Sequence, residues 1–558
     1  MTEPKPGRAT TVAIAIGLSR LSGLLRTALV AGTLGVSAVG DAFAAALRLP
    51  NIIQNLLGEG ALSASFIPEY SRLAEEDEAE AGRLAGGVAS VLIVLAGSLA
   101  LIGIVGARPL TRAVAWGFRG ERFELTVHLV RILSVSAGVL VLSAWCLGVL
   151  NSHRRFFLSY VAPVLWNSTQ IAVLTVVLLL GWSQLDIVDA LAWSVIAGGI
   201  LQVAIQLPGI RRANPHISLN LRWKNAHLRQ VLRRLAPAVL GRGALQVSAF
   251  LDLALASLLA VGATTAIAAA QPLYILPISV IGLSVAAVEL PELSRSNDQL
   301  ANARRTNERL VQVLFLITGV VATYLTVGDL IVDNVFNLFG LRQRWDQDDV
   351  LLVGFTLAVF SLGLPAITTS RLIQNVLYSV GDTKTPATIA LVRVSVSFLI
   401  GAILMFQLDR LLLLEGSIQG LSNILAPLQP LPEAIRENED LPLRLGAVGL
   451  AVGASIGAWV ELALLRRVAI ADHGFQSLTD KGGRRHGAAL VAAIAIGIGA
   501  RLLLPALPRL LCLTLIGSIT VATYVGVARA TRCPGAMQLW SRLRPRSGDS
   551  ATPDGQLT

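Results

Sequence analysis

The stretch Leu511–Val527, LCLTLIGSITVATYVGV, contains no charged residue and belongs to one of several long apolar blocks in the chain. A second block contains Val491–Leu504, VAAIAIGIGARLLL, and a third contains Leu174–Leu180. Blocks of about 20 apolar residues are long enough to cross the hydrocarbon core of a bilayer as helix. Each must be helical, because lipid offers no partner for backbone N–H and C=O groups. The sequence therefore predicts an all-α polytopic membrane protein.

The composition of the whole chain agrees with this prediction. Of its 558 residues, 54% are hydrophobic and 15% are charged, whereas soluble domains carry roughly a quarter charged residues. The apolar blocks predict about fourteen transmembrane helices. These helices are expected to begin near residues 10, 41, 84, 125, 160, 187, 231, 264, 309, 350, 385, 443, 487 and 508.

Basic residues gather in alternate connections between the expected helices. They are Arg72, Arg83, Arg154, Arg155, Arg211, Arg212, Arg222, Arg295, Arg304, Arg305, Lys384, Arg466, Arg467, Lys481, Arg484 and Arg485. On the opposite side, the connection Gly35–Gly40 carries no charge, and the segment Gln407–Leu441 is mostly apolar and acidic. The main exceptions on that side are four arginines of another connection, Arg108, Arg112, Arg119 and Arg122. The positive-inside rule places the basic set in the cytoplasm. We therefore predict a multi-pass protein of the bacterial inner membrane with both termini cytoplasmic.

The two halves of the chain resemble each other at an offset of about 223 residues. Pro68–Arg72, PEYSR, matches Pro291–Arg295, PELSR, and Pro163 matches Pro386. The offset spans an even number of helices, so the repeats run parallel about an axis along the membrane normal, with the substrate site between two lobes. We expect two pseudo-symmetric lobes plus two C-terminal helices. The predicted boundaries are 1–229 for the N-lobe (helices 1–6), 230–442 for the C-lobe (helices 7–11, completed by helix 12), 443–530 for helices 12–14, and 531–558 for a basic, disordered cytoplasmic tail.

Ionisable residues inside the expected helices concentrate in the first two helices of each lobe. In the first lobe they accompany Ser19 and include Arg20, Arg26, Asp41, Arg48 and Glu59. In the second lobe they are Arg242, Asp252 and Glu289, together with the polar Gln271. Such residues usually line a cavity or pathway. In the first lobe the three arginines outnumber the two carboxylates, which favours an anionic headgroup such as a diphosphate, because a guanidinium binds phosphate in bidentate fashion. The alternative is a set of buried ion pairs, for example Asp41 with Arg26 or Glu59 with Arg20.

The segments Ser19–Arg26, Gly40–Phe43, Leu49–Asn51 and Gly58–Ala61 resemble the opening signature of the MurJ/MviN family. Further matches to this family lie at Asn151–Asn167, Leu290–Arg295 and Gly381–Pro386. The resemblance implies a two-lobed helical fold that works by alternating access. It also implies membership of the superfamily that contains the multidrug antiporters and the polysaccharide-lipid flippases.

The resemblance also implies which residues contact the substrate. Arg20 and Arg26 match arginines thought to hold the diphosphate, while Asp41, Asn51 and Glu59 match other functionally sensitive positions. The chain departs from the family pattern at Gln54, where the family has an arginine, and at Gln271-Pro272, where it has an Asp-Arg pair. Arg48 or Arg242 is expected to take over part of the headgroup contact that the missing arginines would make. Alternatively, Arg48 pairs with Asp41, and Arg242 extends to the membrane interface. The candidate substrate-binding residues are Ser19, Arg20, Arg26, Asp41, Arg48, Asn51, Gln54, Glu59, Arg242 and Gln271.

The expected function is translocation of lipid II, an undecaprenyl-diphosphate-linked peptidoglycan precursor, as the resemblance implies. The alternatives are a flippase for another polyprenyl-linked glycolipid, a cation-coupled exporter of the same superfamily, a glycosyltransferase, or a scaffold without transport. The connection Gly35–Gly40 is too short to hold the acidic catalytic loop of such a transferase, so we expect no enzyme. We also expect no cofactor, no metal site and no nucleic-acid partner. A coupling cation and cell-wall synthesis proteins are left open as partners beside the lipid.

Overall fold

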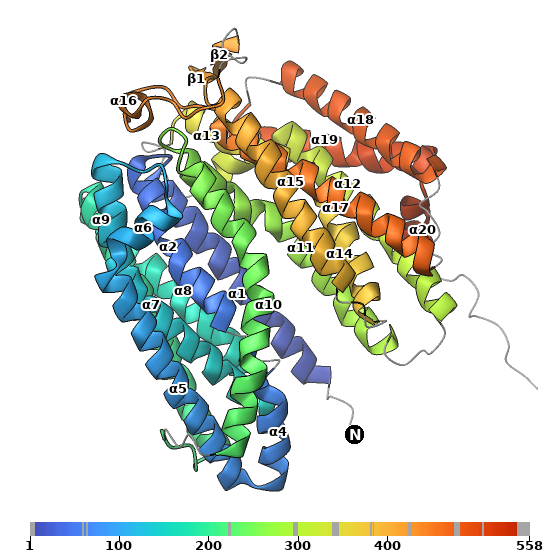
Figure 1. Ribbon diagram of the computed structural model, residues 1–558. Coiled ribbons are helices and arrows are strands. Elements are labelled where there is room, and N and C mark those ends of the chain that lie inside the picture. Colours follow the sequence, from blue (N-terminus) through green and yellow to red (C-terminus); the bar gives the residue numbers. More distant parts are fainter. Residues whose placement is uncertain are drawn as a thin grey trace, which may run out of the picture. The chain divides into compact units, whose positions relative to one another are not determined.

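A computed structural model of the protein describes residues 6–543 apart from 58–60, 63–64, 221–224, 294–298, 338–344, 380–381, 383, 422–426, 474–479 and 505–506. The chain is built from long helices (Figure 1). The first ones are α1 (Pro6–Leu34), α2 (Ala38–Leu57), α4 (Ile67–Glu76), α5 (Glu78–Val105), α6 (Ala107–Val114), α7 (Gly120–Ser152), α8 (Phe156–Leu179) and α9 (Gln184–Ala213). They continue with α10 (Ala226–Ala256), α11 (Ala263–Leu293), α12 (Gln299–Phe336), α13 (Gln347–Ser361), α14 (Leu364–Ser379) and α15 (Lys384–Leu408). After the strands β1 (Leu412–Leu414) and β2 (Ser417–Gln419) come α16 (Glu433–Arg436), α17 (Gly446–His473), α18 (Asp480–Leu503), α19 (Arg509–Ala530) and α20 (Pro534–Leu543).

The predicted helical membrane fold is confirmed. Among the described residues, nine helices are long and apolar enough to span a bilayer, and the pair α13 and α14, bent by 40°, forms a tenth candidate. Four further helices of 20 to 31 residues, α1, α2, α10 and α11, carry most of the ionisable residues discussed above. Each of the fourteen expected starting positions lies in, or a few residues before, a separate helix of this set.

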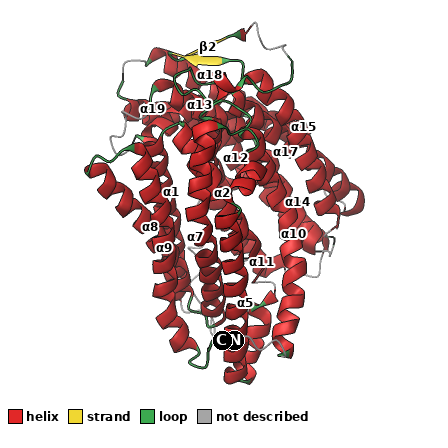
Figure 2. Ribbon diagram, turned by 60° about the vertical axis from the view of Figure 1, so that its left-hand side comes forward, coloured by secondary structure: helices red, strands yellow, loops and turns green. Residues whose placement is uncertain are grey.

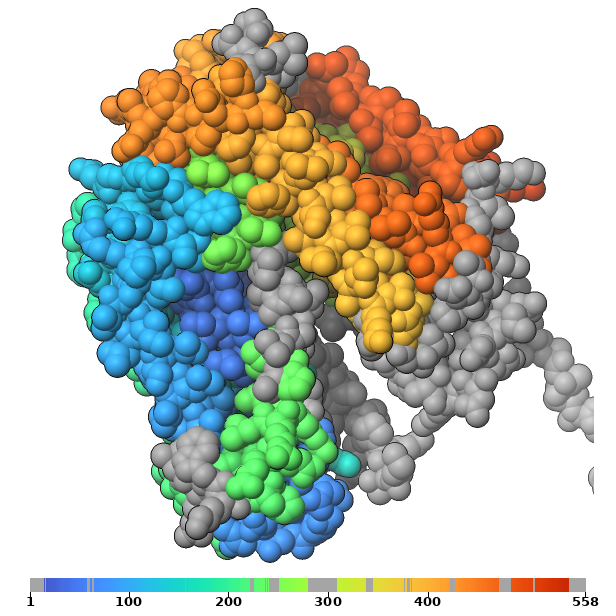
Figure 3. All heavy atoms as spheres, in the orientation of Figure 1, coloured from blue at the N-terminus to red at the C-terminus, as the bar shows by residue number. Residues whose placement is uncertain are grey.

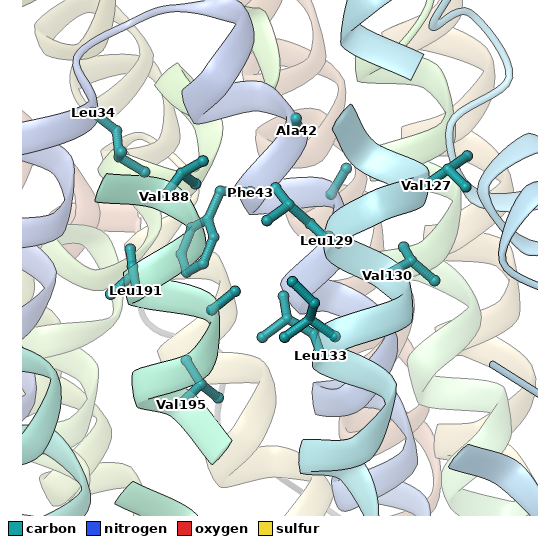
Figure 4. Close-up of a cluster of buried hydrophobic side chains, with 14 of the residues drawn as sticks. Leu34, Ala42, Phe43, Val127, Leu129, Val130, Leu133, Val188, Leu191 and Val195 are labelled. Atoms are coloured by element: carbon teal, nitrogen blue, oxygen red, sulfur yellow. The ribbon is translucent and has the colours of Figure 1, made fainter. Parts of the chain in front are cut away.

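The chain divides into two compact units, and the first contains residues 1–272, 335–353 and 402–450. Helix α7 is its centre: it packs against α2, α5 and α9, and 72% of its most apolar window is buried, against 33% for α5. A helix that is apolar on every side packs among other helices or faces lipid, and the burial of α7 shows that it packs among other helices. Phe43 of α2 points toward Leu191 of α9, with Leu129 of α7 on its other side (Figure 4). This packing sets the position of α2 and its charged residues.

The second unit contains residues 273–334, 354–401 and 451–558. Helix α18 packs against α19, and Phe315 of α12 stacks on Tyr524 of α19 with ring centroids 5.1 Å apart. The Tyr524 hydroxyl donates to the Phe315 carbonyl oxygen over 2.9 Å, which satisfies a polar group that burial would otherwise leave without water. The division into lobes at residues 229 and 442 stays a prediction.

A short hairpin and a loop follow α15. Among the residues that the structure describes, the strands are β1 and β2, paired antiparallel with Leu412 opposite Gln419 (Figure 2). The turn residues Glu415 and Gly416 have φ values of 49° and 77°, as a two-residue turn with positive φ at both positions requires. Residues 409–421 and 427–445, shown in orange, lie over the ends of α6 and α10 in the space-filling view (Figure 3).

Candidate functional site

The first candidate residues lie on α1. Arg20 is exposed, and the backbone carbonyl of the half-buried Ser19 accepts a hydrogen bond from Ser22 Oγ over 3.1 Å. Arg26 lies about two turns further along and is half-buried against α8. The three residues therefore do not form one compact group, and Arg26 is the one that contacts other helices.

The partners of Arg26 are all uncharged. Its guanidinium carbon lies 4.7 Å from the ring centroid of Trp166, and Nη1 lies 3.5 Å from Gln170 Oε1. Nη2 lies 3.4 Å from Thr27 Oγ1, while the buried Nε has no hydrogen-bond partner. Among the described residues no carboxylate lies within 4.0 Å of this side chain. We call Arg26, Thr27, Trp166 and Gln170 the Arg26 cluster.

Asp41 lies in a different environment at the start of α2. Its side chain is fully buried. The oxygen Oδ1 accepts hydrogen bonds from the backbone N and the Oγ1 of Thr265, over 2.7 and 2.8 Å. The oxygen Oδ2 accepts hydrogen bonds from Gly262 N over 2.8 Å and from Arg122 Nη1 over 2.9 Å. Gly262 has a φ of +91°, and a Cβ there would lie 2.5 Å from Val36 Cγ1, so only glycine can present its N–H in this way. The ion pairs of Asp41 with Arg26 or with Arg48, considered above as alternatives, are not found.

Arg122 connects Asp41 to the loop after α15. Its Nε and Nη2 donate to the two carboxylate oxygens of Glu437 over 2.9 and 2.7 Å, and its guanidinium carbon lies 4.2 Å from the Phe118 ring centroid. The Arg122 side chain is only 2% exposed. We call Asp41, Arg122, Gly262, Thr265 and Glu437 the Asp41 hub. The single guanidinium of Arg122 bridges the two carboxylates, so the hub connects α2, α7 and the loop after α15.

Neighbouring loop residues strengthen the same connection. Arg436 Nη1 donates to the carbonyl oxygens of Gly117 and Leu258 over 3.1 and 3.3 Å, and Val261 N donates to the Arg436 carbonyl oxygen over 3.0 Å. The loop is therefore attached to the turn before α7 and to the corner between α10 and α11. Sequence reasoning missed this network, although it noted Arg122 as a basic residue on the side where few were expected.

Arg48 and Gln271 contact each other across α2 and α11. Arg48 Nη1 lies 3.5 Å from Gln271 Oε1, and Asp252 lies close enough to act on the charge of Arg48. The two residues are separated by 223 positions, the offset of the internal repeat, and Asp41 and Thr265 are separated by 224. Both contacts therefore join α2 to α11.

The remaining candidates are less defined. Asn51 and Gln54 are half-buried on α2. Glu59 and the side chain of Arg242 lie outside the described residues. Within the described part of the chain, no group of three or more histidine, cysteine, aspartate or glutamate side chains is arranged to hold a metal ion.

A second charged cluster lies where α4 meets the start of α10. Glu69 accepts from Arg72 over 2.8 Å and lies 2.9 Å from His227 Nδ1. Burial alone would raise the pKa of Glu69, but the hydrogen bonds from Arg72 and His227 outweigh burial and lower it. Glu69 belongs to the repeated PEYSR motif, so the motif has a local structural role that sequence reasoning did not assign.

Comparisons with known protein families and sequences agree with one another. The family model described as lipid II flippase MurJ matches residues 30–419. A probable lipid II flippase MurJ from Rhizobium tropici is 32% identical over 388 residues, which cover 68% of this chain and 72% of that protein. The lipid II flippase MurJ from Burkholderia cenocepacia is 32% identical over 386 residues, with 67% and 73% covered.

Solved structures show the same fold. The lipid II flippase MurJ in an inward closed conformation superimposes with a TM-score of 0.73 at 19% identity, covering 96% of this chain and 99% of that one. An inward-facing multidrug resistance MATE family transporter of the MOP superfamily gives a TM-score of 0.56 at 16% identity, with 84% and 99% covered.

Proposed function

This chain belongs to the lipid II flippase MurJ family, and from that premise we propose that it carries lipid II across the bacterial inner membrane by alternating access. The substrate is amphipathic: its diphosphate and glycan must cross a core that strongly disfavours charge. A protein that performs this step needs a cationic contact inside the membrane and a way to expose that contact to one side at a time.

The observation that carries the proposal is the Arg26 cluster. A guanidinium inside a membrane protein is normally paired with a carboxylate, because desolvation otherwise disfavours its charge. Among the residues that the structure describes, Arg26 has only neutral partners, at 3.4 and 3.5 Å, and its buried Nε has none. Donors in this state can bind an anion that arrives from outside the protein, and a diphosphate fits the planar fork of an arginine.

The Asp41 hub supports the alternating-access part of the proposal. Both Asp41 oxygens are occupied by donors from α7, from the corner before α11 and from α11 itself. We propose that the hub keeps the periplasmic side closed in this conformation, and that it separates when the site opens outward. An occupied carboxylate is also a poor coupling-cation ligand, which favours the flippase over the cation-coupled exporter.

The same proposal includes the topology of the chain. We propose that both termini are cytoplasmic and that residues 409–445 lie in the periplasm, because basic residues are concentrated in the connections on the opposite side. Reporters fused after Arg305 and at Thr558 are expected to give cytoplasmic signals, and one in 415–440 a periplasmic signal. A periplasmic C-terminus would contradict the topology and the parallel repeat.

The function is tested by rescue of a bacterium depleted of its own lipid II flippase. The wild-type chain is expected to restore growth, Arg26→Ala to abolish rescue at normal membrane levels, and Arg26→Lys to restore it partly, since an ammonium lacks the planar fork. Arg131→Ala is the matched control, because Arg131 is an exposed arginine on the spanning helix α7. Full growth with Arg26→Ala would overturn the proposal.

A further inference from the structure

Resting on the proposed function, we propose that Trp166 and Gln170 of α8 are positioning residues: they hold the Arg26 guanidinium in place while leaving its positive charge free for the diphosphate. Both residues are on the face of α8 that packs along α1. They lie four residues apart and so share one helix face.

Trp166 is held by the helix on its far side. Its indole Nε1 donates to the Val195 carbonyl oxygen of α9 over 3.1 Å. Gly198 lies against the same ring, and a Cβ at that position would be 3.0 Å from Trp166 Cδ1. Glycine therefore allows α9 to approach closely enough to restrict the indole. A restricted ring presents one fixed face to Arg26, with the guanidinium carbon 4.7 Å from its centroid.

Gln170 is oriented by its own helix. Its side chain is buried, and Nε2 donates to the Trp166 carbonyl oxygen over 3.2 Å. This bond turns Oε1 toward Arg26 Nη1, at 3.5 Å. One turn of α8 therefore holds both contacts of the guanidinium. Beside them, Asn167 Nδ2 donates to Ser22 Oγ over 3.0 Å, which sets the position of α1 along α8.

The chemistry of these contacts stabilises a cation without neutralising it. An aromatic face attracts a guanidinium through its quadrupole, and an amide oxygen attracts it through a dipole, but neither carries a net negative charge. In contrast, Arg393 of α15 pairs with the carboxylate of Glu461 over 2.9 Å. A carboxylate at the Gln170 position would compete with a phosphate for the same donors. The unpartnered Nε is the second observation that points to a ligand, because a buried donor without an acceptor is unfavourable until one binds.

The test measures binding of undecaprenyl diphosphate to purified protein in lipid nanodiscs. Gln170→Glu places a carboxylate beside Arg26 and is expected to lower affinity about tenfold or more while leaving the thermal unfolding temperature unchanged or higher. Trp166→Leu removes the ring and is expected to lower affinity about five- to tenfold, whereas Trp166→Phe keeps an aromatic face and restores most of it. Trp193→Leu is the matched control, because Trp193 of α9 is 59% exposed.

A double-mutant cycle tests whether Trp166 and Gln170 influence lipid binding through Arg26. In an Arg26→Ala background, Gln170→Glu and Trp166→Leu are expected to cause no further loss, because their target is absent. Additive losses would overturn the positioning role. If Arg26→Ala abolishes binding but the α8 variants bind like wild type, the positioning proposal fails and the proposed function stands. If Arg26→Ala itself binds like wild type, the cation contact of the proposed function fails.

Discussion

Two arginines inside one compact unit are satisfied in opposite ways. Arg122 of the Asp41 hub contacts two carboxylates and is 2% exposed, whereas Arg26 has no carboxylate within 4.0 Å among the described residues and retains a buried donor without a partner. A fully paired buried arginine is costly to disturb and contributes to structure. An uncompensated one contributes little to stability and is available to a ligand. Two residues of the same type therefore differ in how far their charge is compensated.

The largest expected effect comes from removing the paired arginine. Arg122→Ala leaves Asp41 and Glu437 facing each other without a cation, and we expect a loss of about 3–5 kcal/mol in unfolding free energy. Thermal unfolding of purified protein measures it. Arg108→Ala is the control, because its ion pair with Glu124 is about half exposed on both sides and contributes about 0–1 kcal/mol. Equal, small losses in the two variants would contradict a structural role for the hub.

A milder change in the hub tests its role as a closure. Glu437→Gln keeps the shape of the side chain but removes its charge, and it is expected to weaken the attachment of the loop by about 1–2 kcal/mol. A cysteine placed at Ser37, beside the loop, then reacts faster with a membrane-impermeant maleimide. Glu433→Gln, at an exposed residue of α16, should leave the rate unchanged. An unchanged labelling rate in Glu437→Gln would contradict the proposal that the attachment of this loop keeps the periplasmic side closed.

A buried carboxylate directly after α15, Asp409, predicts a pH dependence of stability. Burial raises the pKa of Asp409 to about 7, with Arg444, Arg436 and Arg122 opposing the shift. Because the folded state holds the proton more tightly than the unfolded one, stability is highest below the ordinary pKa of 3.8 and falls as pH rises toward 7. Asp409→Asn should remove this slope and raise the unfolding temperature by a few °C at about pH 8. A variant that follows the wild-type slope would assign the titration to another group.

The smallest expected effect concerns Arg48. With Gln271 at 3.5 Å and Asp252 nearby, Arg48 resembles Arg122 more than Arg26, so Arg48→Ala should reduce affinity for undecaprenyl diphosphate by no more than about threefold. Gln54→Arg, which adds a cation to the same helix, should increase affinity by a similar factor. A loss with Arg48→Ala as large as that with Arg26→Ala would move Arg48 into the binding contact.

The fold was predictable from sequence because its signal is local. Long apolar blocks locate each helix by themselves, so all fourteen expected starting positions match separate helices. The Arg26 environment was predictable in part, as an excess of arginine. The Asp41 hub was not, because the partners of Asp41 lie 81, 221 and 224 residues away and the pairing depends on tertiary packing. The one signal was Arg122 itself, a basic residue on the side where the topology predicts few.

The most direct measurement is lipid II translocation by purified protein reconstituted into liposomes. Wild-type protein is expected to move labelled lipid II across the bilayer, and Arg26→Ala is expected to stop this movement although its thermal unfolding matches that of wild type. Translocation by Arg26→Ala at the wild-type rate would contradict the claim that an uncompensated arginine carries the substrate's headgroup.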